Sequence, residues 1–385
     1  MEKKKIVIIG ASCFQKALIE KSREMDVETH VFAWEQGAEA KEEADYFYPI
    51  SIVEKEQILD VCSKIHPHGV VTIASDLANI TVGYLAEQLG LCANNAACVQ
   101  ATTNKAVMRN KLKKGGVAGP DFWILDATNA MTFKATVPYP LIVKPTDRSG
   151  SRGVRRVENN QELESGIQDA LAHSFEKRVI IEEWVDGQEY SCECISWEGK
   201  HHCLAITKKY TTGSPEYVEI GHLESIDLKC EKLIVQEVFR ALDNLGICWG
   251  ASHTEFKVNA DGQIHLIEVG SRMGGDCIGS DLVRLSTGID YVKNVILIAL
   301  GEAPTLEAGG HYGAVAVKFL LGAKHRRLLC KVKQDQRLHI TYQSPDIHEE
   351  SPVTDSTLRS GYFIFTGDYE LVRKVMEGDY EGQNL

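Results

Sequence analysis

The chain has 385 residues, 44% of them hydrophobic and 25% charged, which is enough to bury two or three cores and excludes a single small module. Its net charge of −12 argues against a nucleic-acid partner, because phosphate-backbone binders carry a clustered basic face. No apolar stretch approaches the roughly 20 residues that span a bilayer, and no signal peptide is recognisable. We therefore expect a cytoplasmic protein with no membrane partner.

The first part of the chain alternates apolar runs with helical patterns. KKKIVIIG is followed by a helical pattern and by VETHVFA, and two more such units run through VVTIAS to LGLCANN. This alternation predicts a doubly wound parallel sheet. Gly10 alone does not make a dinucleotide-binding fingerprint.

A glycine-rich hairpin is predicted by YPLIVKPTDRSGSRGVRRV, with Lys144 at the end of its first strand. Gly150 and Gly153 have no Cβ, so the backbone amides of this loop can approach phosphate oxygens closely, and Lys144 adds a positive charge. The loop is not a Walker loop, which requires GxxxxGK[ST] before a helix. A turn without a ligand is the alternative interpretation.

The segment RVIIEEWVDGQEYSCECIS predicts two strands joined by EEWVDGQE. An adenine ring requires apolar walls with backbone donors and acceptors, and a carboxylate such as Glu189 can hold a ribose. Cys192 and Cys194 stand two apart on the second strand and are spaced as half of a metal site. The 11 cysteines include no CxxC pair, however, and buried packing of these thiols is the favoured interpretation.

A second hairpin is predicted by GASHTEFKVNADGQIHLIEVGSRMGG, in which an Asp-Gly turn joins two short strands. It places Glu255 and Glu268 at matching positions on adjacent strands. Two such carboxylates can share Mg²⁺, which requires oxygen ligands and usually also binds substrate phosphates. Two solvated glutamates are the alternative.

The order of these features resembles the ATP-grasp superfamily, and the resemblance runs from about residue 5 to 320. It implies ATP and Mg²⁺ as cofactors, with Mn²⁺ as an alternative ion, and Glu255 and Glu268 as metal ligands. Lys144 would also act in catalysis. The further ATP contacts that it implies are Lys105, Lys144, Lys209, the loop residues Ser149, Gly150, Ser151, Arg152, Gly153 and Val154, the adenine-hinge residues Glu182, Glu183 and Val185, and Glu189 at the ribose.

The resemblance also implies a three-part chain of mixed α/β and α+β class. Residues 1–95 would form a Rossmann-like pre-ATP-grasp domain, and residues 96–303 the ATP-grasp domain, whose mobile lid would span about 115–187. Two helices are expected to follow the second hairpin. Residues 304–385 would form a β-rich C-terminal domain.

The patterns GASHTEFK and IEVGSRMGG are most similar to the L-amino-acid ligase branch. Gly270 stands where many ATP-grasp enzymes have asparagine, which leaves the number of metal ions open. In this branch a segment like that of Glu219 and His222 faces the amino-acid pocket, although an exposed acid and histidine are the alternative.

Arg272 would hold a substrate carboxylate or the oxyanion, with an ordinary salt bridge as the alternative. Asp276 would either face the substrate pocket and favour a larger or cationic substrate, or cap the following helix. His253 is expected only to pack under the hairpin.

The resemblance implies an ADP-forming carboxylate–amine ligase that acts through an acyl phosphate on an amino acid and a second amino acid or amine. A bicarbonate-activating enzyme, like a carboxylase or a carbamoyl phosphate synthase, is the first alternative. A catalytically silent nucleotide-binding protein is the second. The expected partners are a small-molecule carboxylate and an amine, and a homodimer remains one option for the oligomeric state.

Overall fold

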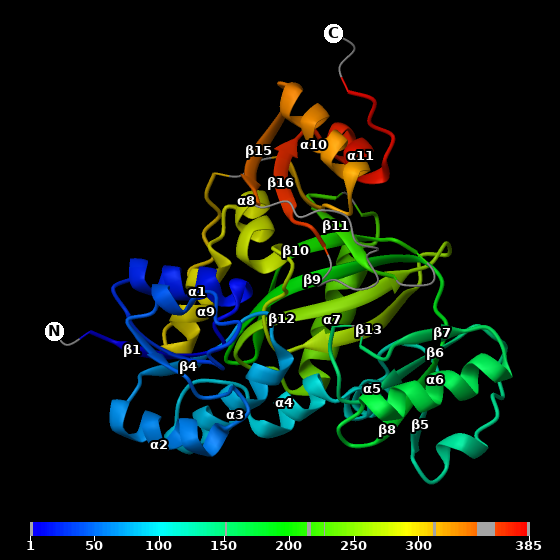
Figure 1. The fold of residues 1–385 in the computed structure, drawn as a ribbon, viewed down its shortest axis with the longest axis horizontal. Coiled ribbons are helices and arrows are strands. Elements are labelled where there is room, and N and C mark those ends of the chain that lie inside the picture. The colour runs from blue at the N-terminus through cyan, green and yellow to red at the C-terminus, as the bar shows by residue number, and fades with distance from the viewer. Residues whose placement is uncertain are drawn as a thin grey trace.

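The computed structural model describes residues 3–150, 152–213, 217–226, 228–310, 313–344 and 359–382. Within these ranges the strands form two four-stranded sheets and one eight-stranded central sheet. Figure 1 shows the N-terminal sheet (blue) on the left and a second small sheet with α6 (green) on the right, with strands of the central sheet between them.

The N-terminal sheet is entirely parallel, with the strand order β3-β2-β1-β4. Its elements are β1 (Lys5–Ile9), α1 (Cys13–Glu24), β2 (Glu28–Phe32), η1 (Lys41–Glu43), β3 (Tyr46–Tyr48), α2 (Lys55–Ile65), β4 (Gly69–Val71) and α3 (Asp76–Leu89). Ile6 and Ile8 pack with α1 and with α9 (Tyr291–Ala299), whereas Val7 and Ile9 pack with α2 and α3. Helices thus cover both faces, as the alternating pattern predicted.

Two helices, α4 (Ala96–Thr103) and α5 (Lys105–Lys114), lead out of this sheet. They meet at Asn104, whose side chain accepts hydrogen bonds from the first amides of α5. This N-cap satisfies amides that have no partner within the helix. It also fixes Lys105 at the first position of α5.

The second small sheet, which we call the lid sheet, is antiparallel and has the order β5-β8-β6-β7. It consists of β5 (Phe122–Asp126), β6 (Leu141–Pro145), β7 (Arg155–Val157) and β8 (Arg178–Glu183), with η2 (Ala130–Thr132) and α6 (Asn160–His173). Leu163 and Ile167 of α6 pack on Leu141 and Val143 of β6. The sheet lies within the range predicted for a mobile lid, and that mobility stays a prediction.

The central sheet has the order β13-β12-β9-β10-β11-β14-β16-β15. Its strands are β9 (Gln188–Trp197), β10 (Lys200–Thr211), β11 (Glu219–Glu224), β12 (Gly250–Val258), β13 (Ile264–Gly270), β14 (Ala314–Phe319), β15 (Leu338–Gln343) and β16 (Tyr362–Gly367). Helix α7 (Glu231–Leu245) buries Ile234, Val238 and Leu242 against β9, β12 and β13. The predicted second hairpin is β12 and β13.

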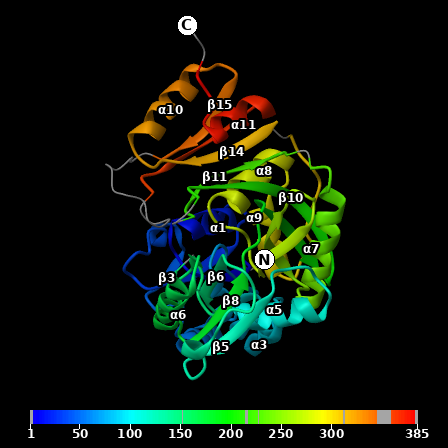
Figure 2. The ribbon, with the colours of Figure 1, turned by 90° about the vertical axis from the view of Figure 1, so that its right-hand side faces the viewer.

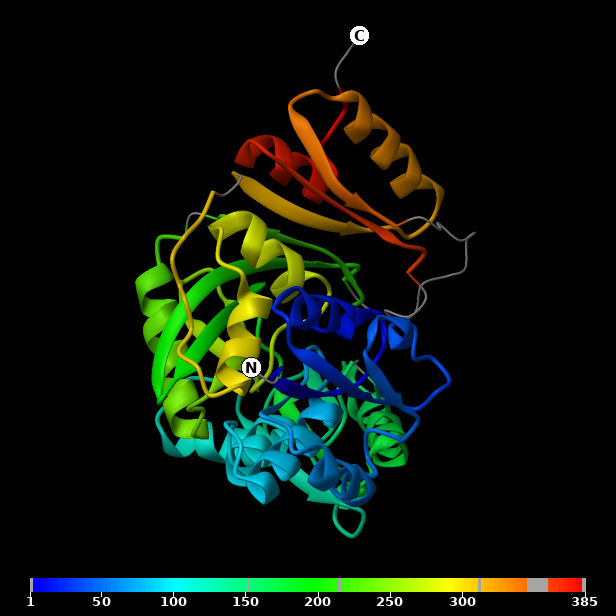
Figure 3. The same cartoon turned by 90° about the vertical axis from the view of Figure 1, so that its left-hand side faces the viewer.

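The predicted helical segment after this hairpin begins with a π-helical turn, η3 (Ile278–Leu282), and continues into α8 (Val283–Thr287) and α9. The region after Pro304 contains two helices, α10 (Ala323–Gln334) and α11 (Tyr369–Glu377), as well as strands. Its strands extend the central sheet, because β14 pairs with β11. Figures 2 and 3 show this orange and red region at the top of the molecule, above the N-terminal and lid sheets. None of the described helices combines the length and the apolar character needed to cross a membrane.

Candidate active site

A pocket of about 1130 Å³ lies between the lid sheet and the strands of the central sheet; we call it the main pocket. The residues that line it are Lys105, Pro120, Ile142, Lys144, Arg148, Ser149, Gly150, Val154, Arg156, Glu182, Glu183, Trp184, Val185, Glu189, Lys209, Thr211, Tyr217, Glu219, Glu255, Lys257, Ile267 and Glu268. Most residues predicted to contact ATP or metal are therefore brought together from segments far apart in sequence. Arg152, Gly153, His222, Arg272 and Asp276 are not among the lining residues, and Ser151 lies outside the described residues.

Glu255 and Glu268 are paired directly opposite each other in the register of β12 and β13. Their side chains are only 23% and 30% exposed, so they are not the two freely solvated carboxylates of the alternative interpretation. Burial raises the pKa of Glu255, but Lys209 and His253 outweigh it and hold the pKa well below its ordinary value. This carboxylate is therefore ionised, as a ligand of a hard cation must be.

Lys209 lies among three carboxylates of the main pocket. Its Nζ is 2.6 Å from Oε1 of Glu255, 3.2 Å from Oε1 of Glu189 and 3.7 Å from Oε1 of Glu219. Burial lowers the pKa of Lys209, but Glu255 and Glu189 outweigh it and raise the pKa well above its ordinary value. The pocket therefore keeps a positive charge at its centre.

Lys105 pairs with Glu268, as Lys209 pairs with Glu255. Its Nζ donates to Oε1 of Glu268 and to the carbonyl of Arg148, both at 2.8 Å. Arg148 directly precedes the glycine-rich loop, so this lysine joins α5, the loop and β13. The sequence had indicated Lys105 as a phosphate contact but not its link to Glu268.

Glu182, predicted to line the adenine hinge, has its carboxylate bound by two cations. Lys144 Nζ lies 2.6 Å from Oε2, and Arg109 Nε donates to Oε1 at 2.6 Å. Burial raises the pKa of Glu182, but Arg109 and Lys144 outweigh it and lower the pKa to about 2. Its side chain therefore holds Lys144 in place, and any adenine contact falls to the backbone and to the residues that follow.

Arg109 is a site residue that sequence reasoning missed. Besides Glu182, it donates to the carbonyls of Leu266 at 2.9 Å and Ile267 at 2.6 Å, so it ties α5 to β8 and β13. In the basic segment KAVMRNKLKK, the sequence pattern predicts that an arginine is a solvated helix residue. Only the fold shows that it is buried.

The glycine-rich loop has left-handed backbone at Gly150, with φ +67°, and at Gly153, with φ +72°. Ser149, Gly150 and Val154 line the main pocket. Gly153 instead packs against α6, because a Cβ there would lie 3.1 Å from atoms of His173 and Pro145. The loop residues that line the main pocket thus stand at its two ends, Ser149 with Gly150 and Val154. Arg148 and Arg156, which the sequence had not indicated, line the pocket beside them.

Trp184 forms an aromatic wall at the end of the pocket near Glu183 and Val185. Lys257 Nζ lies 4.0 Å and the Arg156 guanidinium 4.6 Å from its ring centre, and Tyr217 packs beside it. Lys257 also donates to the carbonyl of Val185 at 3.1 Å. Apolar and aromatic walls beside backbone groups are what a planar heterocycle requires.

His253 does more than pack under the hairpin. It is buried, hydrogen-bonds Glu193 through Nδ1, and places Nε2 3.3 Å from Oε1 of Glu255. Burial lowers the pKa of His253, but Glu193 and Glu255 outweigh it and raise the pKa to about 9. Glu193 also accepts the amide of Gly274 at 3.0 Å, so this pair positions Glu255 relative to the turn after β13.

Arg272 forms a bidentate salt bridge with Asp76 at the start of α3, with Nε 2.8 Å from Oδ1 and Nη2 3.1 Å from Oδ2. Arg272 is therefore in an ordinary salt bridge in this structure, which was the alternative interpretation of its role. It joins the N-terminal sheet to the end of β13. The predicted role at a substrate carboxylate remains a proposal, and it requires Arg272 to exchange one carboxylate for another.

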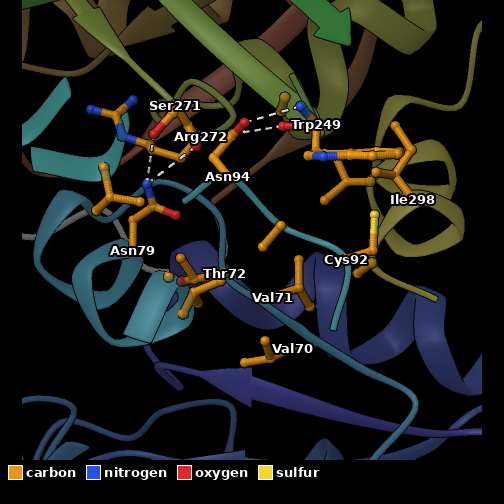
Figure 4. A pocket seen from close by; sticks show the side chains of 18 residues that line it. Val70, Val71, Thr72, Asn79, Cys92, Asn94, Trp249, Ser271, Arg272 and Ile298 are labelled. Atoms are coloured by element: carbon orange, nitrogen blue, oxygen red, sulfur yellow. Dashed lines mark hydrogen bonds between the residues drawn. The ribbon is translucent and has the colours of Figure 1, made fainter. Parts of the chain in front are cut away.

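A second, smaller pocket lies behind Arg272, between β4, α3, α9 and β12 (Figure 4). Its walls are largely apolar, with Val70, Val71 and Ile298 among them. The amides of Asn79 and Asn94 that reach it already hydrogen-bond Ser271 and Trp249. Of the predicted site residues it contains Arg272 alone, so the main pocket is the better candidate.

Of the predicted substrate residues, Glu219 lies beside Lys209, and His222 lies beside Asp276. Glu219 lines the main pocket, whereas His222 is buried, with Nε2 3.8 Å from Oδ2 of Asp276. Asp276 makes a bidentate pair with Arg359, at 2.7 and 2.8 Å. Cys277, not Asp276, is the N-cap of η3, and no side chain caps it, so the predicted helix cap is wrong. The charge of Asp276 is already balanced by Arg359 from the C-terminal region.

The chain is similar to several known proteins. Residues 137–280 match the model of the ATP-grasp domain family. The chain is 29% identical over 241 residues to the uncharacterised protein y4rH of Sinorhizobium fredii, covering 60% of this chain and 49% of that one. It is 28% identical over 192 residues to a D-alanine–D-alanine ligase of Thermosipho africanus, covering 45% of this chain and 51% of the ligase. The chain thus spans about half the length of these curated relatives.

Among solved structures, the L-amino acid ligase of Bacillus licheniformis superposes with a TM-score of 0.79 at 23% identity, covering 98% of this chain and 97% of that one. This match shows a shared fold over nearly the whole chain. Residues 137–280 of the chain thus carry an ATP-grasp domain.

Proposed function

We propose that this protein is an ATP-dependent, ADP-forming carboxylate–amine ligase that joins an amino acid to a second amino acid or amine. The observation that carries the proposal is the convergence of Lys105, Lys144 and Lys209 with the opposed pair Glu255 and Glu268 in one pocket. Three cations and two ionisable oxygen donors suit a polyphosphate together with a divalent metal ion.

The residues of the main pocket fit Mg²⁺. Among the described residues, neither Glu255 nor Glu268 belongs to a cluster of three or more protein metal ligands. An ion held by these two carboxylates therefore needs further oxygens, and phosphate and water are the ligands that Mg²⁺ retains most readily. When bound, it would neutralise charge on the phosphates during transfer.

ATP fits the two ends of the pocket. The apolar end, with Trp184, Val185 and Ile142, would hold the adenine, and Glu189 would hold the ribose. Ser149, Gly150 and Arg148 would face the phosphates, next to Lys105 and Lys144.

The chemistry requires no covalent enzyme intermediate. A carboxylate is a poor acyl donor, and transfer of the γ-phosphoryl group to its oxygen creates a leaving group that an amine can displace. The protein contributes position and charge stabilisation: its lysines hold the phosphates, and Arg272, released from Asp76, holds a carboxylate or the developing oxyanion. Phosphate and ADP leave, and one proton from the amine is lost to solvent.

Product analysis tests this proposal directly. Pairs of amino acids and amines are screened with ATP and Mg²⁺ for phosphate release, with and without bicarbonate. ADP and phosphate that depend on both an acid and an amine support the ligase. Release that depends on bicarbonate instead supports the carboxylase-like alternative, and AMP with pyrophosphate refutes the acyl phosphate. ATP binding without turnover on any pair would favour a silent nucleotide-binding protein.

We also propose a cytoplasmic location and a homodimer, with the two substrates as the other partners. The ATP requirement supports the first. The second is supported by a structural neighbour, the biotin carboxylase domain of Hydrogenobacter thermophilus, whose structure is of a dimer. Sedimentation of the purified chain tests the oligomeric state.

A further inference from the structure

Three cysteine side chains meet on adjacent strands of the central sheet, and we call Cys192, Cys194 and Cys203 the thiol cluster. The Sγ atom of Cys192 lies 3.5 Å from that of Cys194 and 3.5 Å from that of Cys203. All three sulfur atoms lie within 4.8 Å of one another. The sequence analysis identified only Cys192 and Cys194 as spaced like half of a metal site. The third comes from β10, where Cys203 is paired with Cys194.

The thiol cluster lies on the face of the sheet opposite the main pocket. Side chains alternate along a strand, so Cys192 and Cys194 point away from Glu189 and Glu193. Cys192 and Cys194 are fully buried in the core under α7, whereas Cys203 is only partly buried. Cys203 is therefore the member of the cluster that is closest to solvent.

Two buried hydroxyl groups next to the thiol cluster have no partner. Ser252 is paired with Cys194 and Thr254 with Cys192 in the register of β9 and β12, so these side chains share the face of the thiols. Both residues are 0% exposed, and within the described part of the chain neither hydroxyl makes a hydrogen bond. A buried hydroxyl without a partner is unfavourable. Both hydroxyls are thus unpartnered polar groups on the face of the sheet that carries the thiol cluster.

The spacing of the sulfur atoms also suits one ion. With a Zn–S bond of about 2.3 Å, the sulfur atoms of a tetrahedral site lie roughly 3.8 Å apart. The two measured separations of 3.5 Å are within a few tenths of an ångström of that value. Thiolates select soft cations over Mg²⁺, so the two metal sites would not compete.

We propose that Cys192, Cys194 and Cys203 bind one soft, thiol-preferring cation, Zn²⁺ or Cu⁺, at a site separate from the ATP-grasp centre. Each ligating thiol loses its proton to solvent, and no redox change is involved. In the described part of the chain no fourth His, Cys, Asp or Glu joins the group, which leaves one position for water with Zn²⁺ or a three-coordinate site for Cu⁺.

The test uses the full chain with a C13S/C248S/C330S background, which removes the exposed thiols. The fully reduced protein is titrated with Zn²⁺ and, in a separate arm, with Cu⁺, each against a chromophoric chelator. We expect one ion per chain in at least one arm, and at least about a 100-fold loss of affinity in Cys203→Ser. Cys98→Ser is the matched control, because Cys98 is buried in the same core but lies outside the cluster. This variant should bind as the background does.

Two results would overturn the proposal: no stoichiometric binding of either ion, or equal binding by Cys203→Ser and the background. A third result would replace the metal-site proposal with a redox pair. This is a protein that binds neither ion but forms a Cys194–Cys203 disulfide when it is treated with hydrogen peroxide. If Cys203→Ser does not fold, titration of the background protein with Cd²⁺ still tests the metal site. The thiolate–cadmium charge-transfer absorbance must rise and reach its plateau at one Cd²⁺ per chain. None of these readouts depends on ligase activity, so the two proposals stand or fall separately.

Discussion

Glu255 and Glu268 lie opposite each other on β12 and β13, and each carboxylate is bound by a lysine from a different part of the chain, Lys209 on β10 and Lys105 on α5. The lysines balance two close negative charges, which would otherwise destabilise the hairpin. In the proposed function, binding of Mg²⁺ and phosphates would let the same four residues exchange partners without leaving a buried charge unpaired.

The first prediction is that Glu268→Gln nearly abolishes turnover. A neutral amide weakens a hard-cation site, and loss of several kcal/mol of charge stabilisation corresponds to more than about 100-fold in rate. Steady-state rates over a range of Mg²⁺ concentrations measure it. The exposed Glu302→Gln is the control. A wild-type rate for Glu268→Gln at saturating Mg²⁺ would remove Glu268 from the metal site.

The second prediction concerns Arg109. Arg109→Met should lower the free energy of unfolding by about 3–5 kcal/mol, because it leaves the buried Glu182 charge with one partner fewer and two carbonyls without their donor. Urea denaturation measures the change. Arg240→Met, at a half-exposed arginine paired with Glu237, should change it by less than about 1 kcal/mol. Equal effects would show that the Arg109 network contributes little.

The third prediction is that the loop from Ser149 to Val154 exchanges its amide hydrogens faster without nucleotide than with it. Its amides gain phosphate partners only when ATP is bound. Hydrogen exchange followed by mass spectrometry compares the two states, and peptides from α7, far from the loop, serve as the reference. The same protection in both states would count against a phosphate-cradling loop.

The fourth prediction concerns substrate charge. Because Arg359 balances Asp276, Arg359→Gln should leave the carboxylate with a net charge and lower KM for a cationic amine about fivefold, corresponding to roughly 1 kcal/mol. Asp276→Asn should do the reverse and leave KM for ATP unchanged. A substrate panel of neutral and cationic amines measures both variants. A uniform change across the panel would place this ion pair outside the substrate pocket.

The fifth prediction is a pH effect on stability at Glu224, which is fully buried and accepts from Thr207 and Ser286. Burial raises its pKa to about 8. The folded state therefore holds a proton that the unfolded state releases near its ordinary pKa. The resulting stabilisation is complete below about pH 4.5 and is lost as the pH rises through about 8.

Thermal unfolding from pH 5 to 9 tests this effect. We expect the Tm of the wild-type chain to fall toward pH 8, and Glu224→Gln should flatten this fall because an amide does not titrate. Glu302→Gln should keep the wild-type slope. Parallel curves for the wild type and Glu224→Gln would show that Glu224 is ionised in the folded protein.

The sequence by itself determined the elements that depend on local pattern. The alternation of apolar runs predicted the parallel N-terminal sheet, and the Asp-Gly turn between alternating strands predicted the hairpin that carries Glu255 and Glu268. The register shift next to Glu255, which sets it opposite Glu268, is a feature of the folded sheet that the turn does not indicate. The sequence also predicted the turn of the glycine-rich loop, because a positive φ at Gly150 is a local requirement that glycine meets. These features are encoded over a few neighbouring residues.

Tertiary structure decided the partners of the charged side chains. Arg272 with Asp76, Asp276 with Arg359, and Arg109 with Glu182 join residues 73 to 196 positions apart, and no spacing in the sequence indicates such pairs. Cys203 likewise reaches Cys192 only because β9 and β10 are adjacent. A buried charge or thiol takes its partner from whatever the packed fold brings within hydrogen-bonding distance, and that choice is made by the whole sheet arrangement rather than by the local sequence.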